Sequence, residues 1–141
     1  MIAPILLAAA LAAAPAGAAE LRVRVTGGAP GEGRALVQLY LSKHAWMQAP
    51  FAQAAAEIGA DGTGEAVFGD VPPGPAGLAV LYDRDGNGEM TLNAVGMPTE
   101  FLSFSNDPET PGLTIPDWAA VRFVVPAEGA ETSVTLRRGA E

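Results

Sequence analysis

The sequence predicts an all-β fold, an antiparallel β-sandwich of about seven short strands. Two observations predict it. Short runs of residues alternate between apolar and polar side chains, which is the period of a strand with one buried face. The 17 glycines and 12 prolines of the 141-residue chain separate these runs, where they end strands and form turns. This combination is typical of immunoglobulin-like sandwiches.

The first nineteen residues have the composition of a secretory signal peptide. Ile2–Ala14 consists almost entirely of Ala, Leu and Ile, and Ala16–Ala18 supplies the small residues of a cleavage site. We expect cleavage after Ala18 or Ala19, so that residues 1–19 are removed and residues 20–141 form a single β-sandwich domain. The apolar segment is too short for a transmembrane helix. The expected location is the periplasm or the cell exterior.

Composition excludes several classes of function. The chain has no cysteine, so it has no disulfide, no thiol nucleophile and no thiolate metal site, and its export without disulfides suits a bacterial envelope. Its formal net charge of −8 argues against a nucleic-acid partner, because an acidic domain repels phosphate backbones. No second hydrophobic segment follows the first. We therefore expect a monomer that does not span the membrane and whose partner is an envelope protein or a glycan.

The first half of the domain contains four expected strands. Leu21–Val25 alternates cleanly, and after the glycine-rich turn Gly27–Gly33 the segment Ala35–Leu41 resumes as a second strand, so the two are expected to form a hairpin. Gln53–Ile58 is ambiguous, since its alanines favour a helix. We favour a strand that forms a second hairpin with Glu65–Phe68, because a turn-rich loop separates the two segments.

The second half contains the expected central strand. Val71–Pro75 is a rigid turn, because its prolines fix φ and its glycine permits the reversal. Leu78–Tyr82 then has the continuous apolar character of a strand that is buried on both faces. Asp107–Pro116 is expected to be an irregular exposed connection, and Val121–Val125 and Thr132–Leu136 are expected to be the closing strands.

The most informative motif is Asp83-Arg84-Asp85-Gly86-Asn87-Gly88, which directly follows the central strand. Oxygen-bearing side chains occupy every second position before a glycine, as they do where a calcium-binding loop begins. The expected calcium ligands are the side chains of Asp83, Asp85 and Asn87, the backbone carbonyl of Glu89, Thr91 through a water molecule, and Asn93.

Calcium binding by this loop is expected to be weak. The twelfth position, a bidentate glutamate in an EF-hand, is Ala94, so that Asn93 or Glu100 would have to replace it. With fewer anionic ligands, the expected dissociation constant is roughly 10⁻⁴ to 10⁻³ M. The alternative is that the Asp and Asn side chains form Asx-turns, which bind the backbone of the loop itself without a metal.

Four motifs in a fixed order resemble a family of small exported bacterial proteins, catalogued as a domain of unknown function (number 2141). They are a phenylalanine followed by Pro-Pro-Gly (Phe68–Gly74), an apolar strand (Leu78–Tyr82), the D-x-D-x-N-G loop (Asp83–Gly88), and a G-x-P-x-E run followed by F-S-N (Gly96–Glu100 and Phe104–Asn106). The resemblance covers nearly all of the chain after the signal peptide. It implies a sandwich similar to transthyretin and the carboxypeptidase regulatory domains, with no established activity.

The chain departs from the pattern of this family at two positions. Loops of the family usually carry a further aspartate where this chain has Thr91, which removes a carboxylate from the expected calcium site. They also usually have a glycine before the F-S-N triplet, where this chain has Ser103. The first departure reinforces the expectation of weak metal binding, and the second changes the backbone of one turn.

Other polar residues have two interpretations. Glu100, Ser105 and Asn106 would either line a pocket for a small polar ligand or satisfy buried backbone groups, and we favour the second because loop amides need partners. A glycosidase needs a pair of carboxylates, for which Glu100 and Asp117 are the candidates, although no motif pairs them.

The aromatic residues and the single histidine also have a structural and a functional interpretation. Trp46 and Trp118 would stack on a sugar ring in a carbohydrate-binding module, but tryptophan in a small sandwich more often packs at the core. His44 has no cysteine or second histidine to complete a zinc site and no recognisable serine nucleophile. We expect it to be a surface residue.

The sequence thus predicts an exported β-sandwich module with a weak calcium-binding loop and a binding or structural role in the cell envelope. The alternative is a small periplasmic hydrolase or a carbohydrate-binding module that uses the loops around Glu100 and Asp117.

Overall fold

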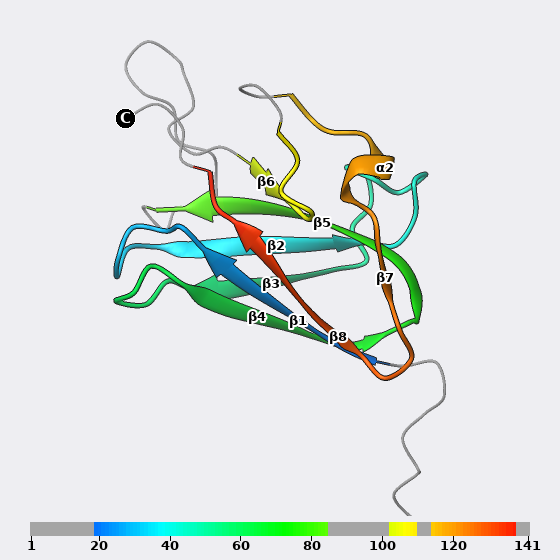
Figure 1. Cartoon of the computed structure of the whole chain (residues 1–141), viewed down its shortest axis with the longest axis horizontal. Coiled ribbons are helices and arrows are strands. Elements are labelled where there is room, and N and C mark those ends of the chain that lie inside the picture. Colours follow the sequence, from blue (N-terminus) through cyan, green and yellow to red (C-terminus); the bar gives the residue numbers. More distant parts are fainter. Residues whose placement is uncertain (1–18, 85–101, 110–113, 138–141) are drawn as a thin grey trace, which may run out of the picture.

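The computed structural model describes residues 19–84, 102–109 and 114–137 (Figure 1). Within these ranges the chain forms β-strands and one short helix, and no helix there is long and apolar enough to cross a membrane. The elements are β1 (Ala19–Thr26), β2 (Arg34–Tyr40), β3 (Ala52–Glu57), β4 (Gly64–Val71), β5 (Gly74–Asp83), β6 (Leu102–Phe104), α2 (Trp118–Val121), β7 (Phe123–Val125) and β8 (Ala130–Thr135).

The strands form two sheets that pack face to face (Figure 1). One sheet has the strand order β4-β1-β8, the other has the order β3-β2-β5-β6, and β7 pairs with the beginning of β5. The predicted all-β sandwich is therefore confirmed. The expectation of a purely antiparallel sandwich is wrong for one pair, because β1 and β8 run parallel. A turn at Pro126–Gly129 reverses the chain after β7 and gives β8 this direction.

The two expected hairpins are absent from the described residues. β1 and β2 lie in different sheets, as do β3 and β4, so the two glycine-rich loops connect sheets and do not form tight turns within one sheet. The loops contact each other instead, since Gly28 N donates to Gly62 O (2.9 Å) and Gly31 N donates to Gly59 O (2.7 Å). Alternation identifies a strand and its buried face, but it does not identify the neighbouring strand.

The structure settles the ambiguous segment and corrects the bounds of another. Gln53–Glu57 is a strand as favoured, because β3 pairs antiparallel with β2 from Leu39↔Ala52 to Arg34↔Glu57, and Ile58 follows its end. The closing strand expected at Val121–Val125 is only partly correct. Val121 ends the short helix α2, and the strand is limited to Phe123–Val125.

The main core lies between the sheets and follows the alternation of the strands. Leu21, Val23 and Val25 of β1 are fully buried, and on the opposite sheet so are Leu78 and Val80 of β5. Burial of each such side chain contributes about 1.5–3 kcal/mol. The central strand is thus where the sequence places it, although Leu81 is only half-buried.

A buried tyrosine fastens a connecting loop to the central strand. The Tyr82 hydroxyl accepts a hydrogen bond from Ala29 N (2.8 Å) and donates one to Glu32 O (2.8 Å). Ala29 is itself buried, so its amide has no access to water as a substitute partner. One side chain of β5 therefore helps to hold the loop between β1 and β2.

Tyr82→Phe is expected to lower the free energy of unfolding by about 1–3 kcal/mol, because it leaves a buried amide without its acceptor. Urea denaturation followed by tryptophan fluorescence measures the change. Tyr40→Phe is the matched control, since the Tyr40 hydroxyl donates to Gln38 Oε1 in a half-buried position and its loss is expected to cost under about 1 kcal/mol. Equal losses in the two variants would contradict the assigned role of Tyr82.

Candidate functional site

A second apolar cluster lies on the face of the five-stranded sheet that points away from the main core. Its buried members are Tyr40, Ala79, Phe104, Trp118 and Val121, and the partly buried side chains of Trp46, Met47 and Leu102 pack against them. We call it the aromatic cluster. It covers only part of the sheet, near α2 and the turn at residues 42–49 (Figure 1).

Trp46 is held at the centre of the aromatic cluster by four contacts. Its ring centroid lies 4.9 Å from that of Tyr40, 5.8 Å from that of Trp118 and 6.0 Å from that of Phe104, in edge-on or tilted arrangements. These separations are typical of favourable aromatic pairs. Trp46 Nε1 also donates to Pro116 O (2.9 Å). The indole ring is therefore fixed in position, as the sequence predicts for a core-edge tryptophan.

Trp118 packs directly on the backbone of the central strand. A Cβ atom added at Gly77 would lie 2.7 Å from Trp118 Cζ3 and 3.1 Å from Val121 Cγ2, closer than normal contacts. Glycine at this position of β5 thus makes room for the indole ring and for α2. Trp118 is 9% exposed, so it does not present a ring face for stacking on a sugar.

Ser105 and Asn106 fasten α2 to the sheet. The Ser105 hydroxyl accepts from Leu78 N (2.9 Å) and donates to Val121 O (2.6 Å), and it is buried. Asn106 Nδ2 donates to Ala120 O and Arg122 O, both at 3.1 Å. The side chains of Ser105 and Asn106 therefore satisfy backbone groups, which was the favoured interpretation from the sequence. Glu100, which was grouped with them in the sequence analysis, lies outside the described residues.

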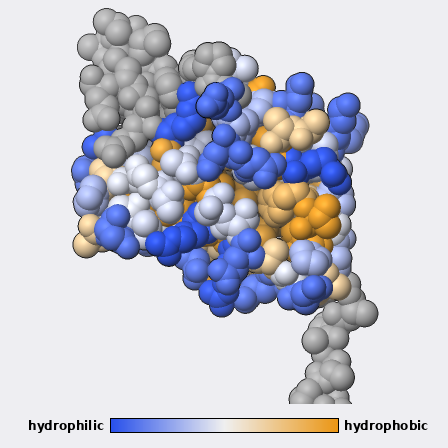
Figure 2. Space-filling view, in the orientation of Figure 1, coloured by the Kyte–Doolittle hydropathy of each residue, from blue (hydrophilic) through white to orange (hydrophobic). Residues whose placement is uncertain are grey.

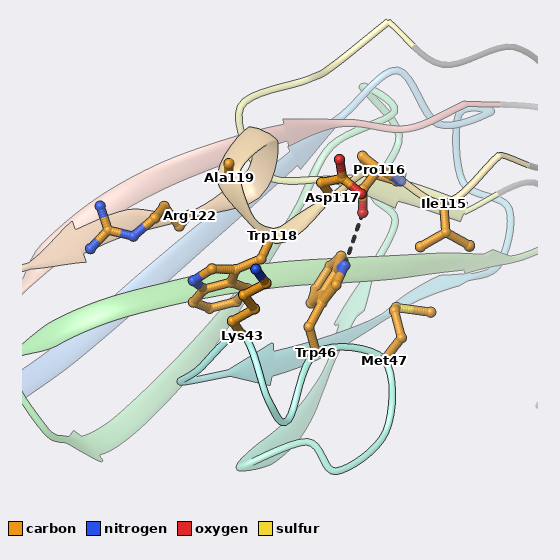
Figure 3. A pocket seen from close by; sticks show the side chains of 9 residues that line it. All are labelled: Lys43, Trp46, Met47, Ile115, Pro116, Asp117, Trp118, Ala119 and Arg122. Carbon is orange, nitrogen blue, oxygen red and sulfur yellow. Dashed lines mark hydrogen bonds between the residues drawn. The ribbon is translucent and has the colours of Figure 1, made fainter.

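A groove with a volume of about 590 Å³ runs beside the aromatic cluster (Figure 3). Its apolar lining comes from two tryptophans and four aliphatic or sulfur-containing residues, and its polar lining comes from two cations and one carboxylate. The lining residues are Lys43, Trp46, Met47, Ile115, Pro116, Asp117, Trp118, Ala119 and Arg122. His44 is exposed in the same turn but does not line the groove.

The sequence singles out three of the lining residues, Trp46, Trp118 and Asp117, but no motif connects them into one groove. It forms because the turn at 42–49 and the segment at 115–122, which lie far apart in the chain, meet at the aromatic cluster, where Trp46 Nε1 donates to Pro116 O. Asp117, which the sequence suggested as a partner of Glu100, is one of its lining residues.

A second, smaller apolar surface lies over β7, where Figure 2 shows hydrophobic residues and where Val124 is 59% exposed.

Asp83, the first residue of the expected calcium loop, is a fully buried residue at the end of β5. Its Oδ2 atom lies 3.6 Å from Arg34 Nε, and Gly33 keeps the adjacent backbone close, since a Cβ there would clash with Asp83 O and Arg84 Cα. Asp83 lies six residues beyond Gly77 on β5, about 20 Å along the strand. Asp83 therefore lies well away from the part of β5 on which Trp118 packs.

The other expected calcium ligands, Asp85, Asn87, Glu89, Thr91 and Asn93, lie outside the described residues. Within residues 19–84, 102–109 and 114–137 no group of three or more histidine, aspartate and glutamate side chains could hold a metal ion.

Gly77→Ala is expected to lower the free energy of unfolding by about 1–3 kcal/mol and to displace Trp118, because the added methyl group overlaps the indole ring. Near-ultraviolet circular dichroism reports the aromatic packing, and a urea titration reports stability. Gly69→Ala is the control, since nothing lies within 4 Å of a Cβ at that exposed position of β4. An unchanged aromatic signal in Gly77→Ala would show that the indole ring does not depend on this contact.

Burial in the aromatic cluster raises the pKa of Tyr40 above its ordinary value of 10.0. Above pH 10 the unfolded chain releases this proton while the folded chain retains it, so stability falls as the pH rises through the folded-state pKa. The Tyr40→Phe variant is therefore expected to lose less stability than the wild-type protein as the pH rises. Thermal unfolding of both proteins from pH 9 to pH 11 measures this loss. The same fall in Tm in both proteins would contradict the raised pKa of Tyr40.

Comparison with known proteins identifies one family and nothing closer. The family described as "Uncharacterized protein conserved in bacteria (DUF2141)" matches residues 23–135, from the middle of β1 to the end of β8. Neither the curated proteins nor the solved structures contain a match to this chain. With most of its length matched, the chain belongs to this uncharacterised bacterial family.

Proposed function

We propose that this protein is an exported binding module, in which the sandwich is the scaffold and the groove beside the aromatic cluster is the ligand-binding surface. The observation that carries the proposal is the groove itself, about 590 Å³ in volume and lined mostly by apolar side chains on a sheet face away from the core. Concave apolar surfaces with a few polar groups are the usual form of small-molecule sites.

Export is supported by the composition of residues 1–19. β1 begins at Ala19, which is buried and paired with Val71. Of the two cleavage points that the sequence suggests, cleavage after Ala18 leaves β1 whole, and it is the one that we propose.

The binding surface is tested by fragment screening with nuclear magnetic resonance, because the chain has only two tryptophans and both indole N–H groups belong to the aromatic cluster. We expect fragments that bind to shift both indole signals. Ala119→Trp is expected to abolish these shifts, because Ala119 is exposed and lines the groove, so a large side chain there fills it.

Ala120→Trp is the matched control. Ala120 is also exposed on α2, but it is not among the residues that line the groove. Fragments that bind only elsewhere, or equally well to both variants, would overturn the proposal.

We also propose that the loop from Asp83 to Asn93 binds calcium weakly. Asp83 would contribute a carboxylate from the rigid end of β5, but the guanidinium of Arg34 lies 3.6 Å from that carboxylate and competes with a cation. Because Arg34 competes with calcium for the Asp83 carboxylate, we expect the affinity of the loop for calcium to be weak. The metal would then stabilise the loop without any part in a reaction.

Calcium at about 10 mM is expected to raise the free energy of unfolding by about 1.4 kcal/mol if the dissociation constant is about 1 mM. This corresponds to a rise of about 3–6 °C in Tm, measured against a sample in EDTA. Asp85→Ala is expected to abolish the rise, whereas Glu131→Gln, an exposed carboxylate of β8, is expected to keep it. The same Tm with calcium and with EDTA would leave the Asx-turn as the role of these side chains.

A hydrolase is the second candidate, and one observation favours it: Asp117 lines the groove. It requires a second carboxylate beside Asp117, for which Glu100 is the candidate from the sequence. If the protein has a measurable glycosidase activity and the Asp117→Asn variant loses it while still folding, the protein is a hydrolase and not a binding module.

A further inference from the structure

The charge of the groove is opposite to that of the protein. The chain carries a net charge of −8, whereas the lining of the groove has two cations, Lys43 and Arg122, and one anion, Asp117. Both cations are exposed, and neither forms a salt bridge within the part of the chain that the structure describes. Two unpaired cations beside one groove of an acidic protein favour an anionic ligand.

The charged and apolar parts of the lining are separated in space. Figure 3 shows Arg122 and Lys43 on the side of Trp118, whereas Met47 and Ile115 lie on the side of Trp46. Ile115 is 43% exposed, so it offers an apolar surface to a ligand. A ligand that matches both parts has an anionic head group and an apolar body.

The backbone at Met47 supports the assignment of the apolar end. Met47 has a φ of 60°, a left-handed conformation that is unfavourable for a residue with a long side chain. Hydrogen bonds within the turn, including Gln48 N to Ala45 O (2.8 Å) and Ala49 N to Ala45 O (2.9 Å), maintain this geometry. Strained residues of this kind are frequent at ligand sites, and methionine adapts readily to flexible apolar ligands.

The lining is less suited to a sugar. Sugar hydroxyl groups need both donors and acceptors, and among the lining residues only Asp117 has a side-chain oxygen that accepts hydrogen bonds, because Lys43 and Arg122 only donate. Trp118 is too buried to stack on a ring, and the remaining apolar lining is mostly aliphatic. A hydrocarbon chain makes better use of this surface than a pyranose ring does.

We propose that the groove binds one molecule of an anionic amphiphile, with its head group near Lys43 and Arg122 and its hydrocarbon chain along Met47 and Ile115. The proposal rests on the function proposed above and adds the chemical class of the ligand. The occupant is a single dissolved molecule and not the surface of a membrane.

The test compares three amphiphiles with the same ten-carbon chain below their micellar concentrations. They are decanoate, the uncharged decyl maltoside and the cationic decyltrimethylammonium. Titration calorimetry gives the affinities, and shifts of the two indole N–H signals show whether binding occurs in the groove. We expect decanoate to bind most tightly and the cationic compound least tightly.

Variants at each end of the groove test the orientation of the ligand. Lys43→Gln and Arg122→Gln are each expected to weaken decanoate binding by roughly three- to tenfold, with little effect on decyl maltoside. Met47→Asn is expected to weaken both compounds equally, because it removes the apolar contact, and asparagine tolerates the left-handed backbone. Arg24→Gln is the control, since Arg24 is an exposed cation of β1 that does not line the groove.

The outcomes separate this proposal from the one on which it rests. Equal affinities for decanoate and decyl maltoside, with both shifting the indole signals, would overturn the ligand class and leave the groove as a binding surface. Tighter binding of glucuronate than of decanoate would also overturn the ligand class, and it would indicate an acidic glycan as the ligand of the groove. Binding only to anionic vesicles would overturn the single-molecule ligand. Failure of the amphiphiles and of every fragment to reach the groove would overturn both proposals.

Discussion

The alternation of large and small side chains on β5 is the constraint on which the rest of the structure depends. On the inner face, Leu78, Val80 and Tyr82 fill the space between the two sheets. On the outer face, Gly77 and Ala79 leave room for the aromatic cluster to pack directly on the strand. One strand therefore supports two apolar clusters, and the groove exists because its outer residues are small.

Side-chain hydrogen bonds link the sheets where backbone pairing ends. Asp107 accepts from both Thr135 N (2.9 Å) and Thr135 Oγ1 (3.0 Å), and Ser103 Oγ accepts from Arg137 N (2.7 Å). These bonds connect the region of β6 to the end of β8 across the side of the sandwich. The neighbouring side chains of Ser105 and Asn106 bond to the backbone of residues 120–122, so they fix the position of α2 beside the groove.

Much of the fold was predictable from the sequence, and the site was not. Period-two alternation located β1 and β4 because it reports which face is buried, but it carries no information about strand partners, so the expected hairpins were wrong. The helix α2 was missed because four residues show no periodicity, and contacts of Trp118 with β5 stabilise it instead. Likewise Arg34, the ion-pair partner of Asp83, lies too far away in sequence for any motif to connect them.

The parallel pairing of β1 with β8 determines when folding can be completed. Leu21 pairs with Ala130, so the first strand of the sandwich waits for a neighbour that is 109 residues later in the chain (130 − 21). A chain that emerges amino terminus first from a ribosome cannot complete its three-stranded sheet until the last strand has emerged. Such long-range pairing slows folding, because the chain must close a large loop before the contact forms. The last strand to be synthesised is therefore the one that completes the sandwich.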